Sequence, residues 1–110
     1  MENSGRNLQN LIKELKRELL SLYSSRLKYL LLFGSYARGQ EKPDYSDIDF
    51  LLVLDDFESP WTEIKKTGEI VSNISLKYGR TISLIPVKEE DYQKRKSPLM
   101  LNIRKEGRIL

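Results

Sequence analysis

Hydrophobic residues recur every three or four positions between residues 8 and 23, which is the spacing of one face of a helix. Charged side chains such as Lys13 and Glu18 fall between them and would face solvent. We therefore expect an amphipathic helix with an apolar stripe made of Leu8, Leu11, Ile12, Leu15, Leu19, Leu22 and Tyr23. So long a stripe can exceed what one small domain covers, so part of it is a candidate surface for a partner protein or a homodimer.

Three shorter segments have the pattern of strands. Residues 29–33 are wholly apolar and stop at Gly34, which is typical of a buried strand that feeds a turn, here placed at residues 34–39. Residues 47–54 form the second segment, and residues 81–87, rich in β-branched side chains, form the third. The second segment ends in an unbroken apolar run, so we expect it to be a central strand.

Helix boundaries are marked by pairs of polar residues and proline. Ser59-Pro60 starts a predicted helix that ends at Gly79, and Ser97-Pro98 starts another that ends at Gly107, before a short terminal strand. Residues 40–46 and 55–59 are expected loops, and Trp61 is expected in the core. The order of elements predicts an α/β or α+β fold, with one sheet flanked by helices in a single domain over residues 1–110.

The composition limits which catalytic and metal-binding side chains the chain can use. The 110 residues include no cysteine and no histidine, which excludes disulfides, thiolate nucleophiles and imidazole bases. A metal would need oxygen ligands, which favours Mg²⁺ or Mn²⁺. No signal peptide or membrane-spanning segment is evident, so we expect a cytoplasmic protein without a membrane partner.

Two aspartates near the start of the second strand form a candidate metal site. Side chains alternate along a strand, so Asp47 and Asp49 would share one face while Ile48 and Phe50 point into the core. Two carboxylates about 7 Å apart repel each other and resist burial unless a cation lies between them.

The segment Gly34-Ser35-Tyr36-Ala37-Arg38-Gly39 is a candidate phosphate cradle. Gly34 allows a sharp turn and a close approach to a ligand, and Ser35 offers a hydroxyl and an amide N–H. Arg38 could contact phosphate or brace the loop through Asp44 or Asp47, and the sequence favours neither role. An anion cradle beside a carboxylate pair is suited to phosphoryl or nucleotidyl transfer.

Together with Ser46-Asp47-Ile48-Asp49 and the apolar strand after it, this segment resembles the signature of the minimal nucleotidyltransferases (MNT proteins) of the DNA polymerase β superfamily. The resemblance implies a mixed sheet of the polymerase β palm type, with ATP and magnesium bound at Gly34, Ser35, Asp47 and Asp49. It also implies a partner from the HEPN family of helical ribonuclease toxins. Some MNT proteins act as antitoxins by transferring AMP to such a toxin.

The sequence departs from the family's pattern at one position. Active members usually carry a third carboxylate on the next core strand, and here that position falls at Ser83. Acids elsewhere in the chain are candidates to replace it: Glu69, Glu89, Glu90 and Asp91.

Three functions remain. The first is a magnesium-dependent protein adenylyltransferase that acts as an antitoxin, and it is favoured. The second, for which Ser83 argues, is a catalytically impaired module that neutralises its partner by binding alone. The third, transfer to RNA ends or small molecules, is disfavoured because no second domain is present to hold a bulky acceptor.

One basic cluster is interpreted as a solvated surface rather than a nucleic-acid site, because no aromatic residues are interleaved with it. Its members are Lys94, Arg95, Lys96, Arg104, Lys105 and Arg108.

Overall fold

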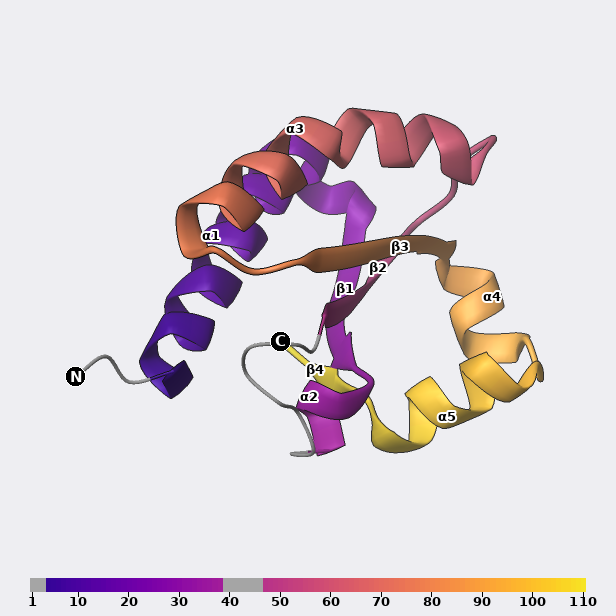
Figure 1. Cartoon of the computed structure of the whole chain (residues 1–110). Helices are drawn as coiled ribbons and strands as arrows, with labels where there is room; N and C mark the ends of the chain where they lie inside the picture. Colours follow the sequence, from indigo (N-terminus) through magenta and orange to yellow (C-terminus); the bar gives the residue numbers. More distant parts are fainter. Residues whose placement is uncertain (1–3, 39–46) are drawn as a thin grey trace.

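Helices on both sides of one β-sheet make up the fold of the computed structural model, which describes residues 4–38 and 47–110 (Figure 1). In chain order the elements are α1 (Ser4–Tyr23), a 3-10 turn η1 (Ser24–Arg26), β1 (Leu27–Phe33), α2 (Ser35–Arg38), β2 (Ile48–Leu54), α3 (Pro60–Tyr78), β3 (Ile82–Lys88), α4 (Glu89–Lys94), α5 (Pro98–Glu106) and β4 (Arg108–Ile109).

The sheet is mixed, with strand order β3-β2-β1-β4. β1 pairs antiparallel with β2 and with β4, whereas β2 and β3 run parallel because α3 crosses over between them. β2 lies between two partners, which confirms that the most apolar strand is central. The mixed sheet with flanking helices confirms the expected fold class.

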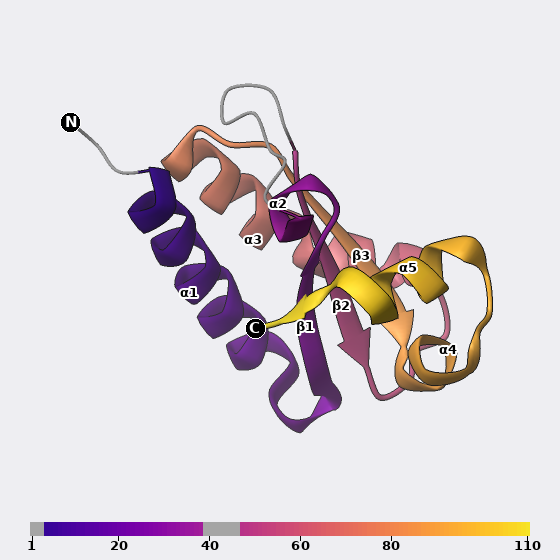
Figure 2. The ribbon, with the colours of Figure 1, turned by 90° about the horizontal axis from the view of Figure 1, so that it is seen from below.

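Each face of the sheet has its own core. On one face, β2 residues Ile48, Phe50 and Leu52 pack with the buried side of α1 and with Ile74 of α3. On the other face, Leu51 and Val53 pack with α5. Figure 2 shows the sheet with α1 on one side and α5 on the other. Because side chains alternate along β2, every second residue faces α5.

The predicted helix boundaries are confirmed by their capping bonds. Ser59 accepts a hydrogen bond from the Trp61 N–H at 3.2 Å, and Gly79 ends α3 with φ 62°, in the left-handed region. Ser97 accepts one from the Met100 N–H at 3.3 Å at the start of α5. The predicted loop at residues 40–46 lies outside the described residues.

The prediction that Trp61 lies in the core is wrong, because its side chain is 72 % exposed. The inward position in the first turn of α3 belongs instead to Glu63, which is buried and accepts a hydrogen bond from the Tyr23 hydroxyl at 2.8 Å. Two residues of a helix correspond to about 200° of rotation, so Trp61 points away from the sheet when Glu63 points toward it.

The stripe on α1 is covered mostly by the domain itself. Leu11, Leu15, Leu19 and Tyr23 are buried, and of the predicted stripe only Leu22 is strongly exposed. The length of this stripe is therefore not evidence for a partner. Among the described helices, none is long and apolar enough to cross a membrane.

Candidate active site

The turn after β1 lies directly against a carboxylate of β2. Gly34 has φ 76°, and a β-carbon added there would lie 2.6 Å from Oδ2 of Asp49. The Ala37 N–H donates to the Gly34 carbonyl at 3.1 Å and closes the turn into α2. Glycine is therefore required here for two reasons, its backbone conformation and the closeness of Asp49.

Strand pairing fixes the position of Asp49. It lies opposite Phe33 in the antiparallel pair with β1 and beside Ser83 in the parallel pair with β3. Ile48 and Phe50 are fully buried on the other face of the sheet, as the alternating pattern predicted. Asp49 therefore belongs to the face that α5 covers, and Asp47 lies exposed immediately before the strand.

The electrostatic environment of Asp47 and Asp49 favours binding of a cation. Burial raises the pKa of the Asp49 carboxyl, and the negative charge of Asp47 raises it further. A carboxylate that is both half-buried and repelled by its neighbour would be relieved by a divalent ion. The donor set is hard oxygen alone, which fits Mg²⁺ or Mn²⁺. Elsewhere among the described residues there is no cluster of three or more carboxylate, imidazole or thiol groups that could hold a metal.

Ser83 is the neighbour of Asp49 on β3. In parallel pairing, side chains in register point to the same face, so the third-acid position that was assigned to Ser83 does adjoin Asp49. The acids considered as replacements are remote. Glu89 opens α4 six residues further on, about 20 Å along an extended strand, and Glu69 lines a hollow with Glu14 between α1 and α3.

The other predicted nucleotide-binding residues belong to the short helix α2. Ser35 begins it and Arg38 ends it, directly after the Gly34 turn. Asp44, one of the two acids considered as partners of Arg38, lies outside the described residues.

Residues 12–110 match the family model described as "Nucleotidyltransferase domain". The chain belongs to this family. A Methanocaldococcus jannaschii protein named "Putative protein adenylyltransferase MJ0604" is 38 % identical over 105 residues, which cover 94 % of this chain and 98 % of the relative. A second protein of that organism with the same kind of name, MJ0141, is 37 % identical over 79 residues, covering 72 % of this chain and 78 % of the relative.

Solved structures share the nucleotidyltransferase fold at lower identity. A chain of a toxin–antitoxin structure with AMP-PNP has a TM-score of 0.59 at 19 % identity, covering 86 % of this chain and 68 % of its own length. A chain from the complex of tri-AMPylated Shewanella oneidensis HEPN toxin with MNT antitoxin has a TM-score of 0.56 at 18 % identity, covering 97 % and 71 %.

Two further residues lie near the candidate site, on the α1 face of the sheet. Tyr36 of α2 is buried, and the Arg80 guanidinium lies over its ring at 5.2 Å. The Tyr36 hydroxyl and one Arg80 nitrogen are buried, and neither has a hydrogen-bond partner within the part of the chain that the structure describes. Tyr36 belongs to the hydrophobic core on that face of the sheet. Arg80 was not singled out, because a lone arginine before a strand carries no motif.

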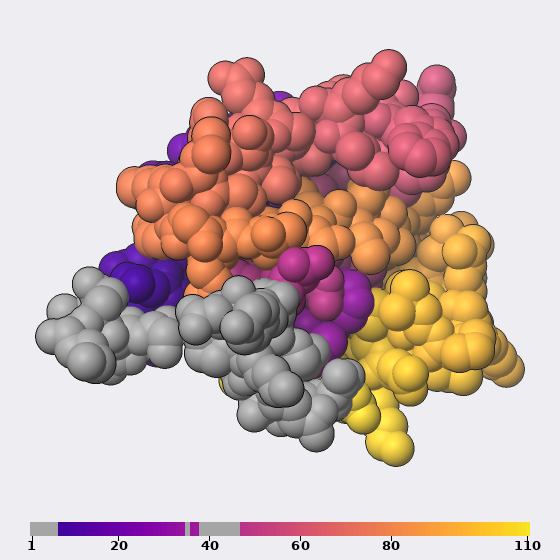
Figure 3. All heavy atoms as spheres, in the orientation of Figure 1, coloured from indigo at the N-terminus to yellow at the C-terminus, as the bar shows by residue number. Residues whose placement is uncertain are grey.

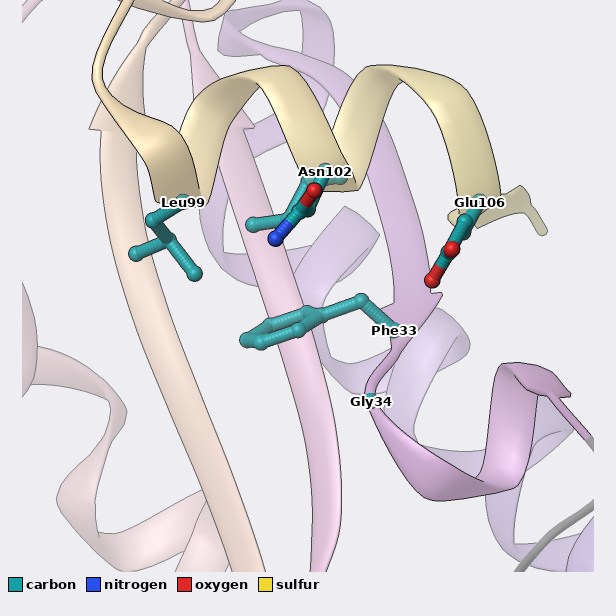
Figure 4. A pocket seen from close by; sticks show the side chains of 6 residues that line it. Phe33, Gly34, Leu99, Asn102 and Glu106 are labelled. Carbon is teal, nitrogen blue, oxygen red and sulfur yellow. The ribbon is translucent and has the colours of Figure 1, made fainter.

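A cavity of about 190 Å³ lies between the end of β1 and α5 (Figure 4). Its lining residues are Phe33, Gly34, Leu99, Asn102, Ile103 and Glu106. No motif predicted this cavity, since the α5 residues are more than sixty positions from Phe33 and follow an ordinary amphipathic pattern.

Proposed function

We propose that this protein transfers AMP from ATP to a side chain of a partner protein, with Mg²⁺ (or Mn²⁺) held by Asp47 and Asp49. The partner we propose is a HEPN-type toxin, for which the chain would act as antitoxin. The observation that carries the proposal is how closely the Gly34 turn approaches the Asp49 carboxylate: a β-carbon added at Gly34 would lie 2.6 Å from Oδ2 of Asp49, so the proposed phosphate cradle adjoins a proposed metal ligand.

The names of related proteins and of solved structures support a protein as acceptor and a toxin as partner. The Methanocaldococcus jannaschii relatives carry the name "Putative protein adenylyltransferase", and chains of similar fold come from toxin–antitoxin complexes. One of those complexes contains AMP-PNP and another contains an AMPylated toxin. Both facts agree with a nucleotide bound at the Gly34 turn and with a protein as acceptor.

The residues of the chain would act in three ways. The N–H groups of the Gly34–Ser35 turn would bind phosphate oxygens, and Arg38 would add positive charge beside them. Asp47 and Asp49 would hold the divalent ion, which when bound neutralises charge on the phosphates and orients them for in-line attack. The buried residues Ile48 and Phe50 on either side of Asp49 would keep its carboxylate in place before the nucleotide arrives.

In the proposed reaction, an acceptor hydroxyl oxygen forms a bond to the α-phosphorus of ATP. The bond from that phosphorus to the bridging oxygen breaks, and pyrophosphate leaves. The hydroxyl proton must leave as well, and the uncharged Ser83 beside Asp49 is a poor acceptor for it. We therefore expect a tyrosine acceptor, since a phenol with a pKa near 10 ionises far more easily than a serine or sugar hydroxyl.

The second candidate is a module that binds its partner without transferring AMP. Ser83 favours it, because the third-acid position next to Asp49 carries no charge. Asp47 and Asp49 could then bind nucleotide only to stabilise the complex.

One experiment separates the two candidates. The chain is purified with the product of the neighbouring gene and incubated with magnesium and ATP labelled at the α-phosphate. Label on the partner supports transfer, and a tight unlabelled complex supports binding alone. The double variant Asp47→Asn/Asp49→Asn should abolish labelling while remaining folded. Equal labelling by that variant would show that the acid pair does not carry the chemistry.

Ser83→Asp tests the proton-transfer step. If the new carboxylate reaches the site, the rate of AMP transfer should rise, by up to the roughly 10²- to 10⁴-fold that a positioned base contributes. Ser83→Asn is the matched control, because it has nearly the same shape and no charge. Equal rates for both variants, with nucleotide binding intact, would mean that proton removal is not what limits transfer.

A further inference from the structure

The cavity beside the Gly34 turn has aromatic, aliphatic and amide surfaces, and the acidic side chain of Glu106 lines it as well. The Phe33 ring forms one side, Leu99 and Ile103 supply aliphatic surface, and Asn102 points its amide toward the ring from α5 (Figure 4). The Asn102 side chain makes no hydrogen bond with the residues that the structure describes. A stacking surface with a polar amide at its edge is suited to a flat heterocycle rather than to an aliphatic chain.

The cavity adjoins the proposed metal and phosphate site. Phe33 lies opposite Asp49 in the antiparallel pair, so their α-carbons are only about 5 Å apart, and Gly34 lines the cavity while touching Asp49. On the surface drawn in Figure 3, magenta atoms lie between the orange segments and the yellow atoms near the C-terminus. A ligand anchored by phosphate at the turn could therefore reach the cavity across a single sugar ring.

Size limits what the cavity can hold. Its volume of about 190 Å³ is below the roughly 300–1,000 Å³ of pockets that enclose a whole small-molecule ligand. It suits one ring system, with the rest of the ligand lying outside on the Gly34 turn. The tyrosine of a partner is the competing occupant, but a phenol has a single polar group and would leave half of the Asn102 amide unpaired.

We propose that this cavity binds the adenine ring of ATP, with Phe33 stacked on the base and the Asn102 amide pairing with its edge. An asparagine amide matches adenine, since its oxygen accepts from the N6 amino group while its nitrogen donates to N7. Guanine presents two acceptors at the same edge, so the amide oxygen would face another oxygen. This inference rests on the proposed function, because it assumes that the phosphates bind at the Gly34 turn.

The test measures binding of ATP, GTP and inorganic tripolyphosphate in magnesium, by calorimetry on the full chain. Asn102→Leu should weaken ATP roughly 5- to 150-fold, the range for one bidentate base contact, and leave GTP and tripolyphosphate unchanged. Phe33→Leu should weaken ATP and GTP together by about tenfold and spare tripolyphosphate. The control is Asn73→Leu, which changes an exposed asparagine on α3 remote from the cavity and should change none of the three affinities.

Each failure has a different meaning. If Asn102→Leu leaves the ratio of ATP to GTP affinity unchanged, the proposed contact between Asn102 and adenine is wrong. The proposed function would still stand in that case, provided that the parent chain binds tripolyphosphate and Asp49→Asn does not. If the parent chain binds neither ATP nor tripolyphosphate, the proposed function and this inference both fall. If Phe33→Leu binds ATP normally but no longer labels the partner, the cavity holds the acceptor side chain, and the base lies elsewhere.

Discussion

Replacing Gly34 with alanine should damage stability and nucleotide binding together. Its φ of 76° costs any other residue about 1–2 kcal/mol. The new methyl group would lie 2.6 Å from Oδ2 of Asp49, whereas ordinary contact begins at 3.4 Å, so the carboxylate must retreat by about 0.8 Å. Holding Asp49 away from its preferred rotamer costs about 0.5–1.5 kcal/mol more. We expect Gly34→Ala to lower the free energy of unfolding by about 1.5–3.5 kcal/mol.

Gly79→Ala is the matched control for this variant. Gly79 has φ 62°, and a β-carbon there meets nothing within 4 Å. It should therefore lose only the backbone contribution of about 1–2 kcal/mol and keep normal ATP binding. Urea denaturation measures the loss of stability, and calorimetry in ATP and magnesium measures binding. In an Asp49→Ala background the carboxylate is gone, so Gly34→Ala should lose no more stability than Gly79→Ala does.

Two outcomes would refute this reasoning. One is an equal loss of stability from the two alanine variants in the parent background, because the contact with Asp49 would then contribute nothing. The other is a Gly34→Ala variant that binds ATP as tightly as the parent. In that case, neither the space above Gly34 nor the placement of Asp49 matters to the nucleotide.

Two further predictions concern stability alone. The pKa of Asp49 is raised in the folded state, so its protonation favours folding below the ordinary value near 3.8, and this contribution is lost as pH rises through the folded pKa. Asp49→Asn should therefore be more stable than the metal-free parent at pH 7 and lose less stability between pH 4 and 7. Thermal unfolding without divalent ions measures this, and the same dependence of stability on pH in both proteins would contradict it. Gly68 lies on the exposed side of α3, away from the helix ends, and a β-carbon added there meets nothing within 4 Å. Gly68→Ala should therefore raise the free energy of unfolding by about 1 kcal/mol in urea titrations, and a decrease would contradict this prediction.

Local signals in the sequence were sufficient to predict the strands and the ends of two helices. Ser59, Gly79 and Ser97 act through hydrogen bonds to residues at most four positions away, so their roles could be predicted without the fold. The central position of β2 could also be predicted, because its apolar residues 50–54 need cover on both faces. The register of Asp49 with Ser83 was anticipated only through the family's pattern, since it depends on how α3 returns the chain to the sheet.

The errors come from interactions between distant segments. Glu63 is buried because Tyr23, forty residues away, donates to it, and this rotates Trp61 toward solvent. α4 was missed because its charged residues have no apolar stripe that could predict a helix. The cavity depends on α5 packing over Phe33, and neither segment alone indicates a ligand.

The placement of the acid pair follows from the same packing that makes β2 the best-buried strand. Asp49 is destabilising when charged, since burial and Asp47 both oppose its ionisation. Neighbours such as Phe50, which is fully buried, stabilise the strand by about 1.5–3 kcal/mol for each large apolar side chain. Burial on both faces therefore offsets the unfavourable carboxylate and also prevents it from moving aside. An Asp49 carboxylate that is held in place beside the charge of Asp47 is preorganised for a cation, so the unfavourable charge that weakens the metal-free fold should favour binding of metal and nucleotide.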